Sequence, residues 1–548
     1  MEALQRLAEA DAIVRLRERD ASLFTDDIDA RIPIMQRLGW TDLAKKAPGR
    51  LPLLVNLASA LADEGVTDIV LLGMGGSSLT PLVLARVIGS APEMPSLHVL
   101  DTTSPAQVKR LLDTLDPQGV FVLIASKSGT TIEPLSLYAI LRAWMDEGIG
   151  RPAAGRRFAV ITDPGTPLEK LRQRENMRVT LSAPATVGGR FSALSMFGLA
   201  PAALIGVDLA RLIAPAATME EACQTPGDEN PAALLAAWLG DAYEQDRDKL
   251  TLVCSTGLRA FGLWTEQLVA ESLGKNGTGV VPVIEHSPEQ PTRYGPDRAV
   301  VVVRLAEDAE LAAWSRETAT AHPVFEIVLA DEYDIGAEFV RWEHAVALLG
   351  HLLGVNPFDE PNVAEAKTAT NAILDGSEVV PKAAVDLDGT WITWAGELAQ
   401  PSPLPPSRVD AVASFAGSAR PGDYIALLAY LPDDETLLMP LRVAAAALER
   451  AAGVPVCLEL GPRYLHSTGQ LHKGGPNTGL FMIVTGRDHT DIEIPGKKFT
   501  LGMLHRAQAE GDLLTLARHG RRVLRFDLPG IGLHDVTTLA DDLGAAVR

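Results

Sequence analysis

The chain has 548 residues, of which 47% are hydrophobic and 22% charged. This length allows about two to four globular domains, and the composition excludes disordered, collagen-like and coiled-coil proteins. The formal net charge of −21 argues against nucleic-acid binding, because a phosphodiester backbone would be repelled, but it still allows a small phosphorylated ligand.

Residues 1–60 are predicted to form helices ahead of the first domain. Residues 1–20 carry charges throughout, which is typical of an amphipathic helix and not of a signal peptide. The longest weakly polar stretch, which begins at Phe197, contains Asp208, Arg211 and two prolines. These residues make a membrane span costly, so we expect buried helices there.

Residues 61–222 alternate short apolar runs with amphipathic segments, a pattern that predicts a doubly wound parallel sheet. The predicted strands are 68–72, 97–100, 120–125 and 158–162. An acidic stretch with proline and glycine at 223–230 marks a boundary. Over residues 223–385 the alternation resumes, with predicted strands at 249–254, 299–303 and 324–329.

A C-terminal α/β domain is predicted over residues 386–548. It includes a proline-rich linker at about 400–422 and then strands at 424–428, 455–460, 480–485 and 523–526. The predicted fold class is therefore α/β, with two doubly wound parallel-sheet domains followed by a third α/β domain.

The three cysteines, Cys223, Cys254 and Cys457, lie far apart and lack metal-ligand spacing. Their odd number argues against a disulfide framework and favours a reducing, cytoplasmic location. The sequence contains no metal-ligand cluster and no nucleotide-binding motif, so we expect neither a metal nor a cofactor.

A glycine-dense turn follows the first predicted strand. Gly73 to Gly76 lead into a helix whose first turn is supplied by Ser77, Ser78 and Thr80. Free N–H groups at such a helix start bind anions, although a tight strand-to-helix turn also needs glycine for backbone reasons alone.

A second polar loop follows the predicted strand 120–125. It reads Ser126-Lys-Ser-Gly-Thr-Thr-Ile-Glu133 and places four hydroxyls and one ammonium at the carboxyl edge of the same sheet, where doubly wound folds bind ligands. The loop lacks the nucleotide pattern GxxxxGK[ST], so a compact phosphate is favoured over a triphosphate; the alternative is that these residues only cap a helix.

Together the two loops resemble the sugar isomerase (SIS) domain of phosphoglucose isomerases. Three further motifs of that family follow in order, namely Val187-Gly-Gly-Arg-Phe-Ser192, Gln267–Lys275 and Asn356–Lys367. The C-terminal sequence 461–476 resembles more particularly the isomerase half of transaldolase/phosphoglucose isomerase fusions. Both predicted doubly wound domains are then expected to be SIS-type domains.

The resemblance implies an aldose–ketose isomerase that interconverts glucose 6-phosphate and fructose 6-phosphate through a cis-enediolate. Glu271 would be the base, and Arg190 would bring a fixed positive charge to the developing oxyanion. Gln267 lies one helical turn before Glu271 on the same face, where the family directs a glutamine towards the phosphate. The phosphate would be bound by Gly76, Ser77, Ser126, Lys127, Ser128, Thr130 and Thr131.

For ring opening the family uses a lysine and a histidine. Lys367 matches the lysine, and His286 lies at about the family's spacing after Glu271 but without the usual surrounding motif. His466 and His472 are alternatives, since they lie in a Gly/Ser/Thr-rich stretch that is typical of a loop.

Glu360 departs from the family pattern, which has a phosphate-contacting glutamine at this position. A carboxylate would repel the substrate dianion unless Lys367, seven positions later on the same predicted helix face, or another cation compensates. This departure leaves the exact sugar phosphate open.

Two alternative functions are a non-catalytic phosphosugar-binding regulator and an isomerase that also accepts mannose 6-phosphate. The regulator would keep the phosphate loops and lose the base, whereas Glu271, Arg190 and Lys367 are all present. The resemblance further implies a homodimer with shared sites. The C-terminal domain would either complete the site through His466 or His472 or only mediate assembly.

Overall fold

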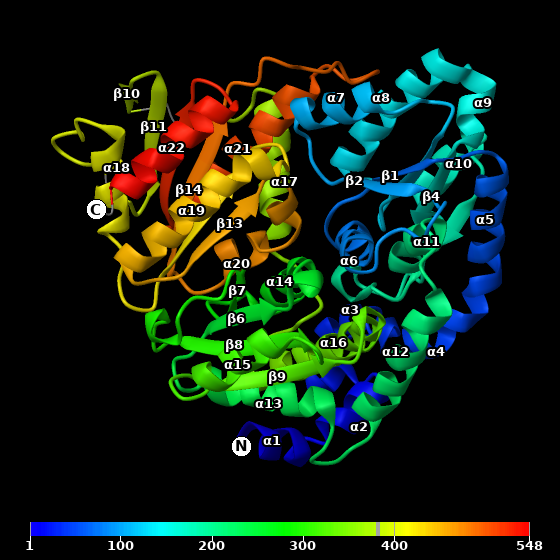
Figure 1. The fold of residues 1–548 in the computed structure, drawn as a ribbon, viewed down its shortest axis with the longest axis horizontal. Coiled ribbons are helices and arrows are strands. Elements are labelled where there is room, and N and C mark those ends of the chain that lie inside the picture. The colour runs from blue at the N-terminus through cyan, green and yellow to red at the C-terminus, as the bar shows by residue number, and fades with distance from the viewer. Residues whose placement is uncertain (1, 380–383, 399, 547–548) are drawn as a thin grey trace. The chain divides into compact units, whose positions relative to one another are not determined.

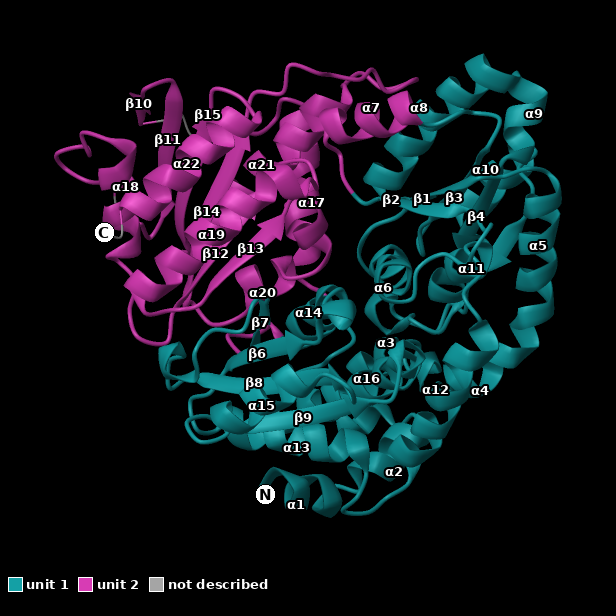
Figure 2. Cartoon of the chain, viewed as in Figure 1, with its two compact units in different colours: residues 1–101, 115–273, 280–359 teal, residues 102–114, 274–279, 360–548 magenta. Residues whose placement is uncertain are grey.

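The fold was analysed in a computed structural model that describes residues 2–379, 384–398 and 400–546 (Figure 1). The predicted α/β class is confirmed, with parallel sheets throughout most of the chain. The chain divides into two compact units (Figure 2). The first unit holds residues 1–101, 115–273 and 280–359, and the second holds residues 102–114, 274–279 and 360–548.

The first unit begins with helices, as predicted. They are α1 (Glu2–Glu9), α2 (Ala12–Arg17), α3 (Ile28–Met35), α4 (Leu43–Lys46) and α5 (Leu51–Asp63). Their apolar faces join one hydrophobic core with the strands and helices that follow, so this segment is part of the first unit and not a separate extension.

The first sheet of this unit is entirely parallel, in the order β2-β1-β3-β4-β5. Its middle strands consist of buried apolar residues without alternation, which is expected when both faces of a parallel sheet are covered. Its strands are β1 (Asp68–Leu72), β2 (Ser96–Leu100), β3 (Val120–Ala125), β4 (Phe158–Thr162) and β5 (Thr180–Ser182). The helices that accompany it are α6 (Leu79–Val87), α8 (Ile132–Ile149), α9 (Arg151–Arg156), α10 (Pro167–Arg174) and α11 (Met196–Leu204). Two further helices, α12 (Leu209–Gln224) and α13 (Pro231–Tyr243), pack against α16 (Ile335–Leu352).

The second sheet of the first unit is also parallel and has the order β7-β6-β8-β9. Its strands are β6 (Lys249–Cys254), β7 (Val281–Glu285), β8 (Arg298–Leu305) and β9 (Val324–Leu329), with helices α14 (Phe261–Leu273), α15 (Ala309–Thr318) and α16 (Ile335–Leu352). β7, which contains Pro282, was not predicted from the sequence. A proline is tolerated there because β7 is an edge strand.

The second unit is built on a mixed sheet in the order β10-β11-β15-β14-β12-β13. Four strands are parallel, and β10 and β11 add an antiparallel hairpin to one edge. The strands are β10 (Val385–Leu387), β11 (Thr390–Gly396), β12 (Tyr424–Ala429), β13 (Val456–Leu460), β14 (Gly479–Gly486) and β15 (Arg522–Leu528). The helices are α7 (Pro105–Thr114), α17 (Val363–Leu374), α18 (Arg408–Ala416), α19 (Glu435–Ala452), α20 (Gly469–Gly474), α21 (Leu501–Arg518) and α22 (Leu533–Ala545).

The second unit also differs in extent from the predicted C-terminal domain. It begins at Glu360 and not at residue 386, because α17 packs against α21 of the same unit. It also takes in α7, where Arg110 forms an ion pair with Asp434, and the backbone N–H of Asp433 donates to Gln107 Oε1 at 2.9 Å. None of the described helices in either unit is long and apolar enough to cross a membrane.

Candidate active site

The two predicted phosphate loops follow neighbouring strands. β1 and β3 pair in parallel, so the turn Gly73–Ser78 and the loop Ser126–Thr131 leave the sheet at the same edge. From β1 the chain continues to β2 on one side of the sheet, and from β3 it continues to β4 on the other side. The two loops therefore lie at the point where the direction of the strand order reverses. Ligands of doubly wound sheets bind at such a reversal, so the predicted convergence of the loops is confirmed at the level of strand topology.

The hydroxyls of the second loop form two hydrogen-bonded pairs. Ser126 Oγ lies 2.9 Å from Thr131 Oγ1, and Ser128 Oγ lies 2.9 Å from Thr130 Oγ1. Gly129 stands between the pairs with a φ of +67° and donates its N–H to Ser126 Oγ at 3.1 Å. Thr131 precedes α8 without capping its N–H groups, so this helix start presents hydroxyls and amides together to an anion.

Lys127, the one cation predicted in this loop, has protein partners. Its ammonium forms an ion pair with Asp163 and donates to the carbonyl of Ala185 at 2.9 Å. The carboxylate offsets the lysine charge, so the loop hydroxyls and backbone amides are the stronger candidates for direct contact with a phosphate.

The first loop packs directly on the turn that carries Arg190. Gly76 and Ser77 are buried in the short helix Gly75–Ser77, and Arg190 lies in the short helix Gly189–Phe191. A Cβ atom on Gly76 would lie only 1.9 Å from the carbonyl oxygen of Gly189. Glycine is required at position 76 because two backbones meet there.

Substitution of Gly76 by alanine is therefore expected to destabilise the protein by about 1 to 3 kcal/mol, since the turn 189–191 has to shift. Gly189→Ala is the matched control, because a Cβ at that position meets nothing within 4 Å. Urea denaturation of both variants checks the prediction. Equal stability of the two variants would contradict it.

Arg190 and Glu271 form a buried ion pair. Arg190 Nη1 lies 3.1 Å from Glu271 Oε1, and the two side chains are 4% and 11% exposed. The other oxygen of the carboxylate, Oε2, accepts a hydrogen bond from Gln267 Nε2 at 3.0 Å. The prediction that Gln267 and Glu271 share one face of a helix is confirmed, since both lie on α14 one turn apart.

The guanidinium of Arg190 is fixed on its other sides as well. Nε donates to Ser272 Oγ at 2.9 Å, and Nη2 donates to the carbonyls of Pro357 and Asp359 at 2.8 and 2.9 Å. These contacts join the glycine turn, α14 and the segment at 356–359 around one planar group. Such a fork of donors needs arginine, because a lysine ammonium cannot reach acceptors that lie this far apart.

An aromatic and acidic layer lies behind the Arg190 turn. The ring of Phe191 stacks on Trp40 with centroids 4.9 Å apart. The backbone N–H of Ala193 donates to Glu343, which lies on α16 and is 2% exposed. Burial raises the pKa of Glu343 well above its ordinary value of 4.5, and the neighbouring Glu220 raises it further. Burial therefore favours the protonated form of Glu343.

The raised pKa of Glu343 predicts a loss of stability with rising pH. Above pH 4.5 the unfolded chain releases the proton of Glu343, whereas the folded state still holds it. Between pH 4.5 and the raised pKa of the folded state, the free energy of unfolding therefore falls by up to about 1.4 kcal/mol per pH unit. Glu343→Gln imitates the protonated group and should remove this loss. Unfolding free energies at about pH 5 and about pH 7.5 check this, with exposed Glu310→Gln as the control; an unchanged pH dependence would contradict it.

The predicted ring-opening residues lie in different surroundings. His286 follows β7 at an exposed position, and Lys367 is exposed on α17 of the second unit. His466 is half-buried, whereas His472 is 1% exposed, and its Nε2 lies 3.3 Å from Glu459 Oε1. The burial of His472 and its pairing with a carboxylate indicate a structural role for this histidine.

Glu360 does not share a helix face with Lys367, and this corrects the sequence analysis. Helix α17 begins only at Val363, so Glu360 precedes it, and the spacing of seven residues does not align the two side chains. The backbone carbonyl of Glu360 accepts from the N–H of Val363 at 3.3 Å. Compensation of the Glu360 charge by Lys367 therefore has no basis in helical periodicity.

Ser272 was missed by the sequence analysis, although it adjoins the predicted base. Its side chain is fully buried and accepts from Arg190 across 82 positions of sequence. The signal was its place inside the motif Gln267–Lys275, where a small hydroxyl directly follows Glu271. The carbonyls of Pro357 and Asp359 left no signal of their own, because any residue type offers a backbone carbonyl.

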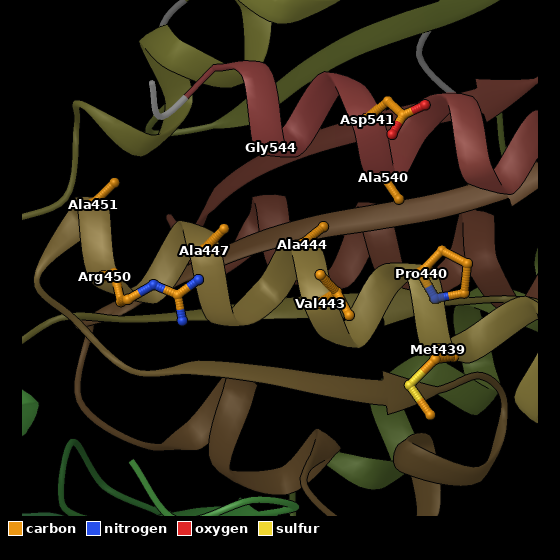
Figure 3. A pocket seen from close by; sticks show the side chains of 10 residues that line it. All are labelled: Met439, Pro440, Val443, Ala444, Ala447, Arg450, Ala451, Ala540, Asp541 and Gly544. Carbon is orange, nitrogen blue, oxygen red and sulfur yellow. The ribbon is translucent and has the colours of Figure 1, made fainter. Parts of the chain in front are cut away.

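A groove on the second unit is not part of this constellation (Figure 3). It lies between α19 and α22 and has a volume of about 610 Å³. Met439, Val443 and Ala447 contribute apolar lining, and Arg450 and Asp541 are its charged residues. None of the predicted site residues lines this groove.

Comparison with known families supports the motifs named above. A model of the family described as phosphoglucose isomerase matches residues 59–292, a range that includes both loops, Arg190 and Glu271. The glucose-6-phosphate isomerase of Rubrobacter xylanophilus is 32% identical over 367 residues, which cover 58% of this chain and 85% of the relative. That of Thermus thermophilus is 32% identical over 383 residues, 62% of this chain and 90% of the relative.

Solved structures resemble the fold over much of the chain. A hypothetical protein from Thermus thermophilus matches with a TM-score of 0.59 and 28% identity, covering 68% of this chain and 96% of that one. A glucose-6-phosphate isomerase from Chlamydia trachomatis matches with a TM-score of 0.52 and 21% identity, covering 61% and 74%. The second likeness concerns the fold alone.

Proposed function

The chain belongs to the phosphoglucose isomerase family and is a glucose-6-phosphate isomerase, and we propose that Glu271 carries the proton in its reaction. Conversion of an aldose phosphate to a ketose phosphate removes the proton at C2 and returns one to C1, with a cis-enediolate between the two steps. A single carboxylate on one side of the substrate is able to do both. Glu271 suits this task because its carboxylate is held at both oxygens by Arg190 and Gln267.

The orientation of the Glu271 carboxylate is set by two donors. Arg190 Nη1 lies beside Oε1, and Gln267 Nε2 donates to Oε2. These two donors fix the orientation of Glu271 without requiring a proton on it. A base whose orientation is fixed in advance loses less entropy when the substrate reaches the transition state.

Arg190 is proposed to stabilise the enediolate by charge. The guanidinium stays protonated at any working pH, so it acts electrostatically and does not exchange protons with the substrate. Its position is set by Ser272 and two backbone carbonyls, so little reorganisation is needed as negative charge develops.

The phosphate group is proposed to bind at the carboxyl edge of the first sheet. Hydroxyls and amides of both loops would hold it, namely those of Gly76, Ser77, Ser126, Ser128, Thr130 and Thr131. Lys127 would add positive charge from its place beside Asp163. Gln267, predicted from the family to face the phosphate, is engaged by Glu271 and is proposed to orient the base as well.

Ring opening is proposed to use Lys367 and His286. Both side chains are exposed, so each is accessible to a sugar phosphate from solvent. An acid and a base acting on the ring oxygen and on the hydroxyl at C1 are what the cyclic substrate requires before its C2 proton becomes acidic.

The observation that carries the proposal is the buried group of Glu271, Arg190 and Gln267. It is tested by incubating the purified protein with glucose 6-phosphate and, separately, with mannose 6-phosphate, and by measuring fructose 6-phosphate. Formation of fructose 6-phosphate from glucose 6-phosphate is expected. Binding of the sugar phosphates without turnover would favour a regulator instead, and turnover of both would reveal dual specificity.

We also propose that the protein is cytoplasmic and that it forms the homodimer that its family resemblance implies. The thiols of Cys223, Cys254 and Cys457 are all buried and unpaired with one another, which suits a reducing compartment. Burial raises the pKa of Cys223 and of Cys254 to about 12, so neither is reactive as a thiolate. The molar mass of the purified protein, measured by light scattering during size-exclusion chromatography, tests the dimer. The mass of a single chain would contradict it.

A further inference from the structure

The C-terminal motif at residues 461–476 has no part in the chemistry proposed above, yet most of its polar side chains are buried in the second unit. Tyr464 OH donates to Asp512 Oδ2 at 2.7 Å, and Lys473 Nζ lies 2.5 Å from Asp512 Oδ1. His472 and Thr468 both contact Glu459. These contacts join the motif to β13, which carries Glu459, and to α21, which carries Asp512.

Gln470 is the member of this motif that contacts other functional segments. Its side chain is fully buried. Gln470 Nε2 donates to the carbonyl of Gly274 at 3.0 Å and to Asn362 Oδ1 at 2.8 Å. In return Gln470 Oε1 accepts from the backbone N–H of Asn362 at 2.9 Å. Both the Nε2 and the Oε1 of Gln470 are therefore hydrogen-bonded to two other segments of the chain, at Gly274 and at Asn362.

Those two segments flank residues of the proposed site in the sequence. Gly274 follows Leu273, the last residue of α14, the helix that carries Glu271. Asn362 immediately precedes Val363, the first residue of α17, which carries Lys367. The side chain of Asn362 does not cap its own helix, so Gln470 takes over the pairing of this helix start.

The close approach of these segments depends on glycine as well. A Cβ on Gly474 would lie 2.5 Å from Asn362 Oδ1, 2.6 Å from Gln470 Nε2 and 2.9 Å from the carbonyl of Gly274. The carbonyl of Gly474 also accepts from the N–H of Gly277 at 2.9 Å. Three backbone segments, at Gly274, Asn362 and Gly474, thus meet around the Gln470 amide and leave no space for another side chain.

We infer that Gln470 is a positioning residue for ring opening: by pairing with Asn362 it sets the start of α17 and hence the position of Lys367. This inference rests on the proposed function, because it takes Lys367 as the ring-opening lysine. It also gives the C-terminal motif a role in the reaction without placing any of its residues against the substrate.

The test uses a readout that reports which step limits the rate. With glucose 6-phosphate deuterated at C2, a primary isotope effect on kcat/KM appears only while proton transfer limits turnover. Gln470→Ala is expected to lower kcat/KM about 10- to 100-fold and to reduce the isotope effect towards unity, because ring opening becomes slow when Lys367 is misplaced. Lys367→Ala should show the same signature, and the double variant should be no worse than Lys367→Ala alone.

Thr485→Ala is the matched control. Thr485 is a buried polar residue of the same unit that lies on β14 and donates to Asp527 Oδ1 at 2.9 Å, so its loss should leave α17 in place and the isotope effect as in wild type. If Gln470→Ala does not fold, Asn362→Ala at a half-buried position is the second variant. It removes the Oδ1 acceptor of Gln470 Nε2 while the backbone N–H still donates to Gln470 Oε1, and it should shift the isotope effect in the same direction.

A wild-type isotope effect in these variants would overturn the inference, whether or not kcat falls, because a smaller active fraction lowers kcat without changing which step is slow. That result would leave the proposed function intact. Absence of isomerase activity in the wild-type protein would instead refute the proposed function, so the two failures are distinguishable.

Discussion

Glu271→Gln is expected to lower kcat about 10²- to 10⁴-fold, the contribution typical of a general base. Glutamine has nearly the same shape and still accepts a hydrogen bond from Arg190 Nη1 through its carbonyl oxygen, but it cannot take the proton from C2. The substrate contacts at the phosphate loops are unchanged, so KM should change much less than kcat. Steady-state kinetics in both directions, from glucose 6-phosphate and from fructose 6-phosphate, measure the effect.

The control for this variant is Glu266→Gln, on the same helix. Glu266 is half-buried and carries the same functional group, but its spacing of five residues places it on a different face of α14 from Glu271. We expect Glu266→Gln to retain most of the wild-type kcat. A Glu271→Gln variant as active as this control would refute the assignment of the base.

Arg190→Lys is expected to affect both stability and rate. A single ammonium cannot serve Ser272 Oγ, Glu271 Oε1 and the carbonyls of Pro357 and Asp359 together. Leaving two of these buried acceptors without a donor costs about 2 to 5 kcal/mol. The enediolate would also lose its oriented partner, which lowers kcat by about 10²- to 10³-fold.

The two effects of Arg190→Lys are separable with a second arginine of the first unit. Arg142 is 8% exposed, with Nε donating to Asp146 at 2.7 Å and Nη2 donating to the carbonyl of Arg151 at 3.2 Å. Arg142→Lys should lower the unfolding free energy in urea while the folded enzyme retains its kcat. If Arg190→Lys behaved in the same way, Arg190 would be a structural residue and not an electrostatic catalyst.

The strands that carry the site could be predicted from sequence because they are continuous apolar runs. The runs at 68–72, 120–125 and 249–254 coincide with β1, β3 and β6. Strands with weaker signals were missed, such as β7 with its internal proline. The β10–β11 hairpin was also missed, although its turn Asp388-Gly389 has positive φ at both residues, the pattern of a two-residue hairpin loop.

Within the site, helical periodicity predicted a contact between residues of one helix but not the contacts between residues of different elements. The pairing of Gln267 with Glu271 follows from a spacing of four on a helix. The partners of Arg190 at Ser272, Pro357 and Asp359 lie 82, 167 and 169 positions away, and no pattern in a single sequence encodes such contacts. The misjudged relation of Glu360 to Lys367 shows the same limit, since it depended on where a helix begins.

The segments 102–114 and 274–279 belong to the second compact unit, although the chain on either side of each belongs to the first. No single cut of the polypeptide therefore yields two self-contained pieces. A fragment that stops at residue 359 would retain α7 without Asp434 and Gly274 without Gln470. Exchange of residues 360–548 for those of a relative is therefore expected to disrupt these contacts unless residues 102–114 and 274–279 are exchanged with them.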